Sequence, residues 1–189
     1  MKFALLIAFT LVSLSLRAQE KEIDSFLGIK FGATKAEVLR AMTARGSILD
    51  TKENTPDIQQ YKNVKLGFRK VDLFSVRFVN DKVFQADFYF LAPLEAQTIE
   101  FYDKIVEDVN DVYGKGNAYK TFKTPYEDGD GYELTAIKTG KATYRTYWTR
   151  KNTIVAEIVP AMAVKLQYQD SELVNIAIEK QKQAQKSDF

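Results

Sequence analysis

Two stretches of the sequence match each other without a gap and indicate the fold: "VRFVNDKVFQADF" (76–88) and "TYWTRKNTIVAEI" (146–158). In each stretch, apolar and polar side chains alternate on both sides of a short polar turn. This pattern is typical of a β-hairpin with one buried face. When the two stretches are superimposed, Ala86 falls on Ala156 and Asp87 falls on Glu157. The match predicts two hairpins of one kind, and hence an internal repeat.

The alternation also predicts the register of the first hairpin, because cross-strand neighbours share one face of a sheet. We expect Phe78 to lie opposite Phe84. We expect Val76 to lie opposite Ala86, with a three-residue turn at 80–82. On the outward face, the same register brings Ser75 opposite Asp87.

The second hairpin follows the same reasoning. Trp148 should lie opposite Ile154, and the turn is then Arg150–Asn152, with Asn152 suited to a left-handed third position. On the outward face, this register brings Arg145 opposite Glu157, a pair of opposite charges.

Helices are predicted before each set of strands. The segment 31–46 has Thr34 and Glu37 at capping-box spacing and Gly46 as a stop. A second, longer apolar stripe of helical spacing, which includes Val112, runs from Pro93 to Gly114. Further strands are expected at 61–68, 132–136 and 164–168.

The predicted fold class is α+β. Two tandem helix-plus-three-strand units, at approximately 24–92 and 93–169, form one antiparallel sheet with helices on one face. A C-terminal helix at 170–186, capped by Asp170 or Ser171, completes a single domain over 19–189.

The first 18 residues have the features of a secretory signal peptide. Lys2 precedes an almost uncharged apolar run, 3–16, which is too short to span a bilayer, and cleavage is expected after Ala18. The chain has no cysteine and therefore no lipobox for a lipid anchor. We expect a periplasmic or secreted protein without a transmembrane segment.

Composition excludes several classes of function. Cleavage would remove Lys2 and Arg17, and the remaining 25 basic residues would then balance 25 acidic ones, which argues against nucleic acid as a partner. The absence of cysteine and histidine excludes disulfides, catalytic Ser-His-Asp and Cys-His arrangements and histidine-ligated zinc. The sequence gives no indication of a cofactor or a metal site.

The outward residues of the two hairpins are the candidate binding residues, because arginine and tyrosine are enriched in protein interfaces. They are Arg77, Gln85, Asp87, Tyr89, Arg145, Tyr147 and Glu157. A polar, solvated sheet face is the alternative interpretation of the same residues.

Carboxylates suggest two other hypotheses. Asp87 and Glu157 occupy equivalent positions and could act as the acid and base of a glycosidase, although cross-strand ion pairing is the simpler interpretation. The acidic stretch "YEDGDGYE" (126–133) could hold calcium, but it lacks the ligands of an EF-hand at Tyr132 and Thr139. An exposed turn is the simpler interpretation there.

The stretch "GIKFGATKAEVLRAM" (28–42) resembles the helix start of the SmpA/BamE outer-membrane assembly lipoproteins. The duplicated order of helix and strands is similar to that of the beta-lactamase inhibitor protein. The "AQ" cleavage region and the Lys- and Gln-rich C-terminal helix resemble exported proteins of the Bacteroidetes type. The chain lacks the lipobox cysteine of the first family and the disulfide cysteines of the second, so no functional residue is transferred from either.

These observations favour a non-enzymatic, exported binding or envelope-associated protein that uses an open sheet face. Its partner would be another envelope protein or a glycan. A carboxylate-based hydrolase, such as a glycosidase, is the alternative.

Overall fold

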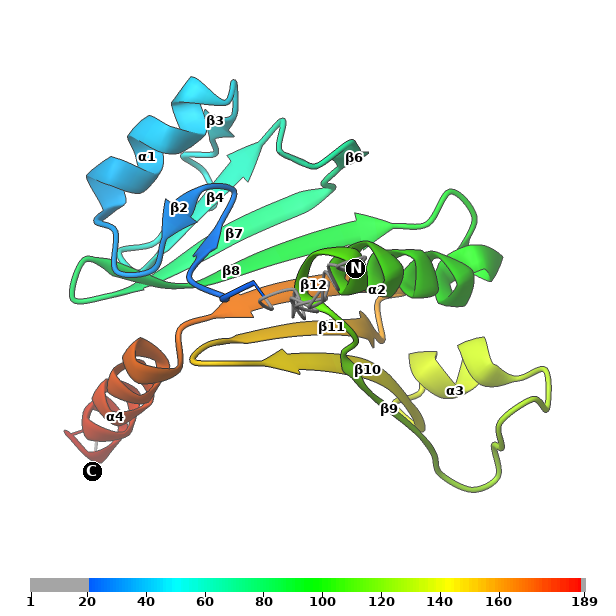
Figure 1. Ribbon diagram of the computed structural model, residues 1–189. Coiled ribbons are helices and arrows are strands. Elements are labelled where there is room, and N and C mark those ends of the chain that lie inside the picture. Colours follow the sequence, from blue (N-terminus) through cyan, green and yellow to red (C-terminus); the bar gives the residue numbers. More distant parts are fainter. Residues whose placement is uncertain (1–20, 188–189) are drawn as a thin grey trace, which may run out of the picture.

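The computed structural model describes residues 21–187, so the expected signal peptide at 1–18 lies outside the described residues. Within residues 21–187, four α-helices surround one large antiparallel sheet (Figure 1). The α+β class, the antiparallel sheet and the C-terminal helix predicted from the sequence are confirmed.

Eight strands of the described chain build the large sheet. Their order across the sheet is β3 (Ile48–Leu49), β4 (Ile58–Lys62), β7 (Leu73–Val79), β8 (Lys82–Leu91), β12 (Ala163–Gln169), β11 (Thr153–Val159), β10 (Ala142–Thr149) and β9 (Asn117–Phe122). Each half of the chain contributes four strands to the sheet rather than three. The last strand of each half, β8 and β12, pair at the centre of the sheet. The two halves therefore share one continuous sheet.

Helices of both halves cover the same face of this sheet (Figure 1). Side chains of three helices join the strands in one apolar core; these helices are α1 (Lys35–Ala44), α2 (Thr98–Tyr113, preceded by the 3-10 turn η1, Glu95–Gln97) and α3 (Glu133–Lys138). Two small hairpins lie on the same side, β1 (Ser25–Phe26) with β2 (Ile29–Lys30) and β5 (Lys65–Leu66) with β6 (Arg69–Lys70). We call the other face of the sheet the open face.

The N-terminal caps of α1 and α4 (Ser171–Ser187), and the glycine that ends α1, are those expected from the sequence. Thr34 and Glu37 form a complete capping box, and Gly46 has a positive φ of 78° after the last turn of α1. The Asp170 carboxylate accepts hydrogen bonds from the backbone N–H groups of Glu172 and Leu173, so it caps α4.

The first hairpin departs from the predicted register at its turn. Val76 lies opposite Ala86 as expected, but Phe78 lies opposite Val83 rather than Phe84. The turn has two residues, Asn80 and Asp81, both with positive φ, a conformation that suits the twist of a hairpin and that these residue types tolerate.

Phe84 is the extra residue of a β-bulge. The prediction was wrong here because strict alternation leaves no place for a bulge. The bulge brings Val83 into the main core and restores the expected orientation from Ala86 onward. Phe84 instead lines a shallow pocket together with Ala177 and Ala184 of α4.

The second hairpin has the predicted register. Trp148 lies opposite Ile154, and Thr149 pairs with Thr153, which leaves a three-residue turn. The expectation of a left-handed Asn152 was wrong, since Asn152 does not have a positive φ. Its buried side chain donates to the Ile23 carbonyl and accepts from the Ser171 N–H, so it fixes the turn by tertiary contacts.

The segment between α2 and β10 is the least well predicted part of the chain. The strand expected at 132–136 is helix α3, in which Ala136 and Ile137 are buried. The edge strand β9 was missed, because its mostly exposed side chains give no alternation of buried and exposed positions. Two other expectations were wrong: Val112 is 46% exposed, and the strand expected over 61–68 divides between β4 and the β5–β6 hairpin.

The positions of the two hairpins in the sheet affect the interpretation of the repeat. β7 and β8 are the third and fourth strands of the first half, whereas β10 and β11 are the second and third strands of the second half. The gapless sequence match therefore compares strands at different places in each half. A duplication between 24–92 and 93–169 stays a prediction.

Candidate functional site on the open sheet face

A row of polar and aromatic side chains crosses the middle of the open face. Tyr89 of β8 lies opposite Lys165 of β12, and Lys165 lies opposite Glu157 of β11. Glu157 lies opposite Arg145 of β10, which in turn lies opposite Tyr119 of the edge strand β9. We call these five residues the central row. Their shared register places all of them on the face away from α1–α3.

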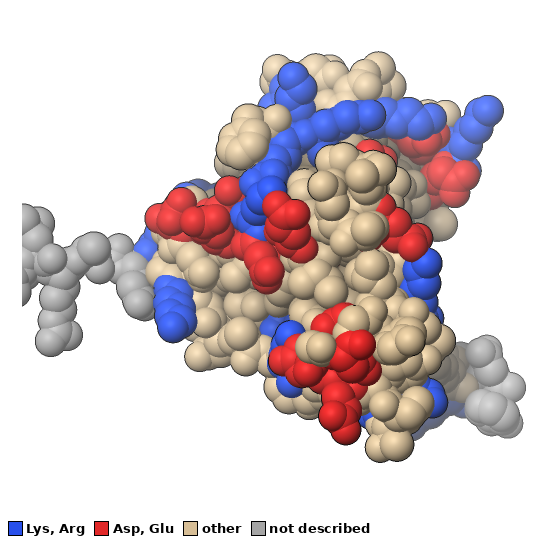
Figure 2. Space-filling view, turned by 90° about the vertical axis from the view of Figure 1, so that its right-hand side faces the viewer, with Lys and Arg blue, Asp and Glu red and all other residues tan. Residues whose placement is uncertain are grey.

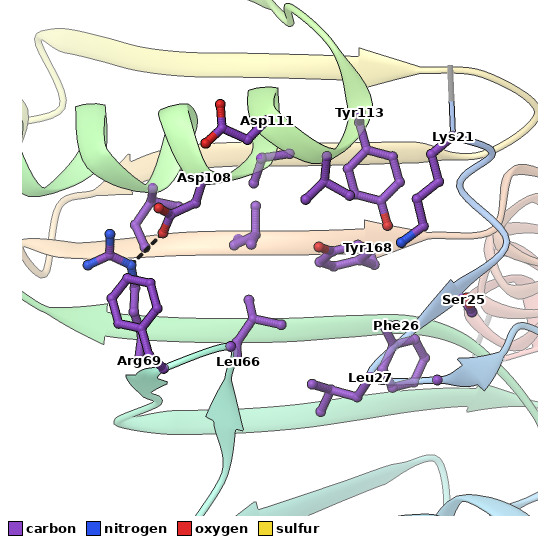
Figure 3. Close-up of a pocket in the computed structure, with 17 residues that line it drawn as sticks. Lys21, Ser25, Phe26, Leu27, Leu66, Arg69, Asp108, Asp111, Tyr113 and Tyr168 are labelled. Atoms are coloured by element: carbon purple, nitrogen blue, oxygen red, sulfur yellow. Dashed lines mark hydrogen bonds and ion pairs between the residues drawn. The ribbon is translucent and has the colours of Figure 1, made fainter. Parts of the chain in front are cut away.

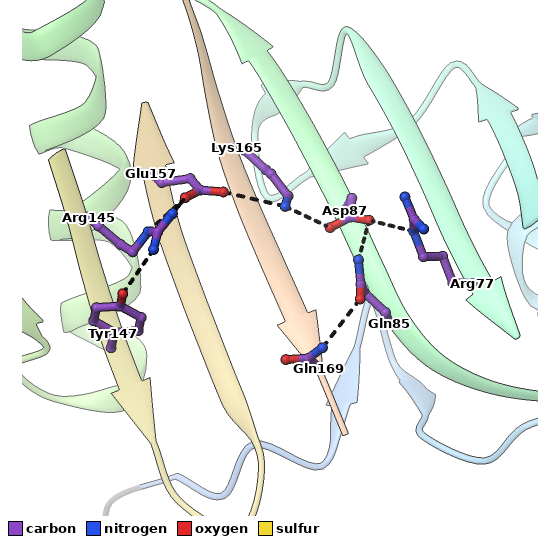
Figure 4. Close-up of polar contacts among 8 residues, drawn as sticks. All are labelled: Arg77, Gln85, Asp87, Arg145, Tyr147, Glu157, Lys165 and Gln169. Atoms are coloured by element: carbon purple, nitrogen blue, oxygen red, sulfur yellow. Dashed lines mark hydrogen bonds and ion pairs between the residues drawn. The ribbon is translucent and has the colours of Figure 1, made fainter. Parts of the chain in front are cut away.

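Ion pairs connect the three charged residues of the central row, Lys165, Glu157 and Arg145 (Figure 4). The Glu157 carboxylate accepts a hydrogen bond from Arg145 Nε at 2.7 Å and a second one from Arg145 Nη2. The other carboxylate oxygen of Glu157 lies 3.4 Å from Lys165 Nζ. Arg145 also donates from Nη1 to the Tyr147 hydroxyl at 3.2 Å. The hydrogen bond to Tyr147, followed by the hydrogen bond to Glu157, raises the pKa of Arg145.

The network continues from Lys165 to Asp87 on β8. Asp87 Oδ1 lies 3.7 Å from Lys165 Nζ, and Asp87 Oδ2 lies 3.5 Å from Arg77 Nε. Gln85 Nε2 donates to Asp87 Oδ2 at 2.7 Å, and Gln169 Nε2 donates to Gln85 Oε1 at 3.4 Å. The polar contacts thus run without a break from β7 to β10 (Figure 4).

Asp87 is the most enclosed member of this network. Only 1% of the residue is exposed, and its Oδ1 atom has no hydrogen-bond partner among the described residues. A carboxylate removed from water requires compensating charges, and here Lys165 and Arg77 supply them. The position of Lys165 is therefore tightly constrained, since it contacts both carboxylates.

Three tyrosines surround the charged network. Tyr89 and Tyr147 are half-buried, whereas Tyr119 is 52% exposed at the edge of the sheet. Burial, together with the nearby Asp87 charge, raises the pKa of Tyr89, so its hydroxyl stays protonated at neutral pH. The face thus offers aromatic rings with hydroxyl groups beside fixed charges.

The structure brings all seven sequence-predicted residues onto one face, and two predicted pairings are confirmed: Ser75 opposite Asp87 and Arg145 opposite Glu157. Sequence reasoning missed three contributors, Lys165, Gln169 and Tyr119. The alternation of Val164, Leu166 and Tyr168 would have predicted that Lys165 and Gln169 point outward. No local signal indicates that β12 lies between β8 and β11.

Carboxylates of the acidic segment 126–133 accept hydrogen bonds from backbone N–H groups of the same segment. Asp130 accepts hydrogen bonds from the N–H groups of Glu127 and Tyr132, and Glu133 accepts one from Gly129. Figure 2 shows acidic side chains gathered low on this side of the molecule, where the loop between β9 and α3 lies. Over residues 21–187, no group of three or more acidic side chains is arranged to hold a metal ion.

Comparisons with family models, with curated proteins and with solved structures give no match to this chain. Among the helices of the described part, none has the length and apolar character needed to cross a membrane.

Proposed function

We propose that this protein is an exported, non-enzymatic binding module whose open sheet face contacts another envelope protein. The continuous polar network from Arg77 to Tyr147 carries the proposal. Its charged side chains are held in place before any partner arrives, so little side-chain freedom remains to be lost on binding. Arginine and tyrosine are also the residue types that contribute most to protein interfaces.

The network crosses five neighbouring strands, from β7 to β10, and so suits a broad partner surface. The network has three cations, Arg77, Arg145 and Lys165, and two carboxylates, Asp87 and Glu157. Because these charges largely compensate each other, the face has only a small excess of positive charge. This balance favours a specific polar surface over a general polyanion.

The geometry gives less support to the alternative, a hydrolase that uses Asp87 and Glu157 as its acid and base. Lys165 Nζ lies between the two carboxylates, within 3.7 Å of one and 3.4 Å of the other. A glycosidic oxygen would need to displace this ammonium group in order to lie between them. The binding hypothesis requires no such rearrangement.

Combined replacement of Tyr89 and Tyr147 by alanine tests the binding face. We expect each substitution to lower the free energy of unfolding by about 1 kcal/mol or less, since both residues are only half-buried. The double variant should nevertheless lose a partner that the natural chain retains, because aromatic anchors dominate such interfaces. Cross-linking in envelope extract, followed by quantitative mass spectrometry, measures this loss.

Tyr132→Ala is the matched control, because Tyr132 is 63% exposed and lies before α3, away from the open face. It should retain every partner. If the double variant folds and also retains every partner, the open face is not the binding site. If the captured partner survives protease treatment of the extract, it is a glycan rather than a protein.

The expected signal peptide gives a separate prediction about the N-terminus of the exported chain. If residues 1–18 are a signal peptide, the secreted chain should begin at Gln19. Intact-mass analysis of material recovered from outside the cytoplasm measures this directly. A full-length mass in that fraction would contradict cleavage after Ala18.

A further inference from the structure

A second candidate site lies on the opposite side of the sheet from the central row. It is a groove of about 520 Å³ between α2 on one side and the β1–β2 and β5–β6 hairpins on the other. Its floor is β12, the central strand that joins the two halves of the sheet. Ligand pockets in proteins have volumes of about 300 to 1,000 Å³, so the groove is large enough for a small molecule.

The walls of the groove are mainly apolar. Val109 and Val112 of α2 face Phe26 and Leu66 of the two hairpins, and Leu166 lies on the floor. The α2 residues that line the groove extend from Ile105 to Tyr113, a distance of about 12 Å at 1.5 Å per residue. The groove can therefore accommodate an extended aliphatic chain of medium length.

The two ends of the groove differ in polarity (Figure 3). At one end Arg69 Nε donates to Asp108 Oδ2 at 2.5 Å, so the charges of this pair compensate each other. At the other end the Lys21 ammonium lies 5.3 Å from the centre of the Tyr113 ring, beside Tyr168.

The cations that line the groove are Lys21 and Arg69, and its carboxylates are Asp108 and Asp111. Because Arg69 pairs with Asp108, Lys21 is the groove cation that has no ion pair within residues 21–187. Burial raises the pKa values of Tyr113 and Tyr168, so both hydroxyls remain protonated at neutral pH. The ring centres of these two tyrosines lie 6.5 Å apart, and both residues line the groove beside Lys21. The nearby Asp24 carboxylate accepts a hydrogen bond from Ser25 Oγ at 2.8 Å and does not line the groove.

We propose that this groove binds an aliphatic chain with a single anionic head, of the type found in fatty acids. The chain would lie along the apolar walls, and the carboxylate would contact Lys21 and a hydroxyl of the neighbouring tyrosines. The arrangement follows the general pattern of ligand sites, in which an apolar body fills the cavity and a few polar groups fix its orientation. This site is independent of the proposed binding face.

Calorimetric titration of the secreted chain with decanoate tests the proposal, with decanol as an uncharged probe of equal chain length. We expect saturable binding of decanoate and weaker binding of decanol. Lys21→Gln should remove most of this difference, because the head would lose its charge partner. Val112→Trp should place a large ring in the groove and weaken decanoate binding by at least about tenfold.

Ile178→Trp is the matched control, since Ile178 is exposed on α4 to nearly the same extent as Val112 on α2, 43% against 46%. It should bind decanoate as the natural chain does. Three results would each overturn the proposal: no saturable binding, equal affinity for decanoate and decanol, or full affinity in Val112→Trp. Sedimentation that shows a dimer broken by Val112→Trp would instead make the groove a contact between two copies, which also overturns it.

Discussion

Trp148→Ala should lower the free energy of unfolding by about 3 to 5 kcal/mol, the range for removing a large aromatic side chain from a packed core. Trp148 is 1% exposed and belongs to the main core. Its indole N–H donates to the Gly114 carbonyl at 3.0 Å and to Asn110 Oδ1 at 3.1 Å, so the ring also links β10 to the end of α2.

The fit around this ring is tight. A methyl group added at Gly116 would lie 2.6 Å from Trp148 Cε2, so the glycine backbone is in close contact with the indole. Alanine at 148 would therefore leave a cavity next to Gly116 and remove the hydrogen bonds to Asn110 and Gly114. The surrounding backbone can collapse into such a cavity only in part.

Urea unfolding followed by circular dichroism measures the effect, because the variant has lost the only tryptophan of the chain. Tyr119→Ala is the control: its side chain is half-exposed on the neighbouring strand β9, and the change should be within about 0.5 kcal/mol. In the natural protein, indole emission typical of exposure to water would contradict the buried register.

Lys165→Met should have the second largest effect, a loss of about 3 kcal/mol in the free energy of unfolding. Lys165 is 17% exposed in its side chain, and it is the only described residue that contacts both Asp87 and Glu157. Methionine retains the length of the side chain and removes its charge. Asp87 would then remain buried with Arg77 as its remaining cation, at 3.5 Å.

The expected value lies at the low end of the range for breaking a buried pair, because Arg77 remains and Glu157 keeps its contact with Arg145. Lys151→Met is the matched control. Lys151 pairs with Glu172 at 3.5 Å, but both side chains are mostly exposed, so the same substitution should cost less than about 1 kcal/mol.

The double variant Asp87→Asn with Lys165→Met separates charge from packing. Neutralising Asp87 should recover part of the loss, because the uncompensated carboxylate is then absent. Equal losses in Lys165→Met and Lys151→Met would contradict the idea that the network is a fixed, buried arrangement. The proposed binding face would then have no rigid charged centre.

Local sequence patterns predicted the parts of the fold that depend on neighbouring residues. The capping box at Thr34, the cap at Asp170 and the pairing of Trp148 with Ile154 are all present. Each of these features arises from residues that are close in the chain. There, the spacing of residues predicts which side chain can cap a helix, and alternation predicts which residues pair across a hairpin.

The predictions that were wrong show where local patterns are insufficient. Phe84, the extra residue of the bulge, lines a pocket with α4, and the Asn152 side chain donates to the Ile23 carbonyl; both neighbours are distant in the sequence. The expected strand at 132–136 used the alternation of Tyr132, Leu134 and Ala136, whereas helix α3 leaves Tyr132 exposed and buries the adjacent residues Ala136 and Ile137 against the sheet. Short apolar runs are ambiguous for this reason.

The sequence by itself determined which side chains of β10, of β11 and of β8 from Ala86 onward face the core, and so placed Asp87, Arg145 and Glu157 on one open face. Only the tertiary structure decided that β12 pairs with both β8 and β11. That pairing puts Lys165 between the two carboxylates and makes β12 the floor of the groove. Alternation fixes the face of a residue because it repeats within one strand. The order of strands depends on how the helices and both halves bury their apolar surfaces together, and no single segment encodes that.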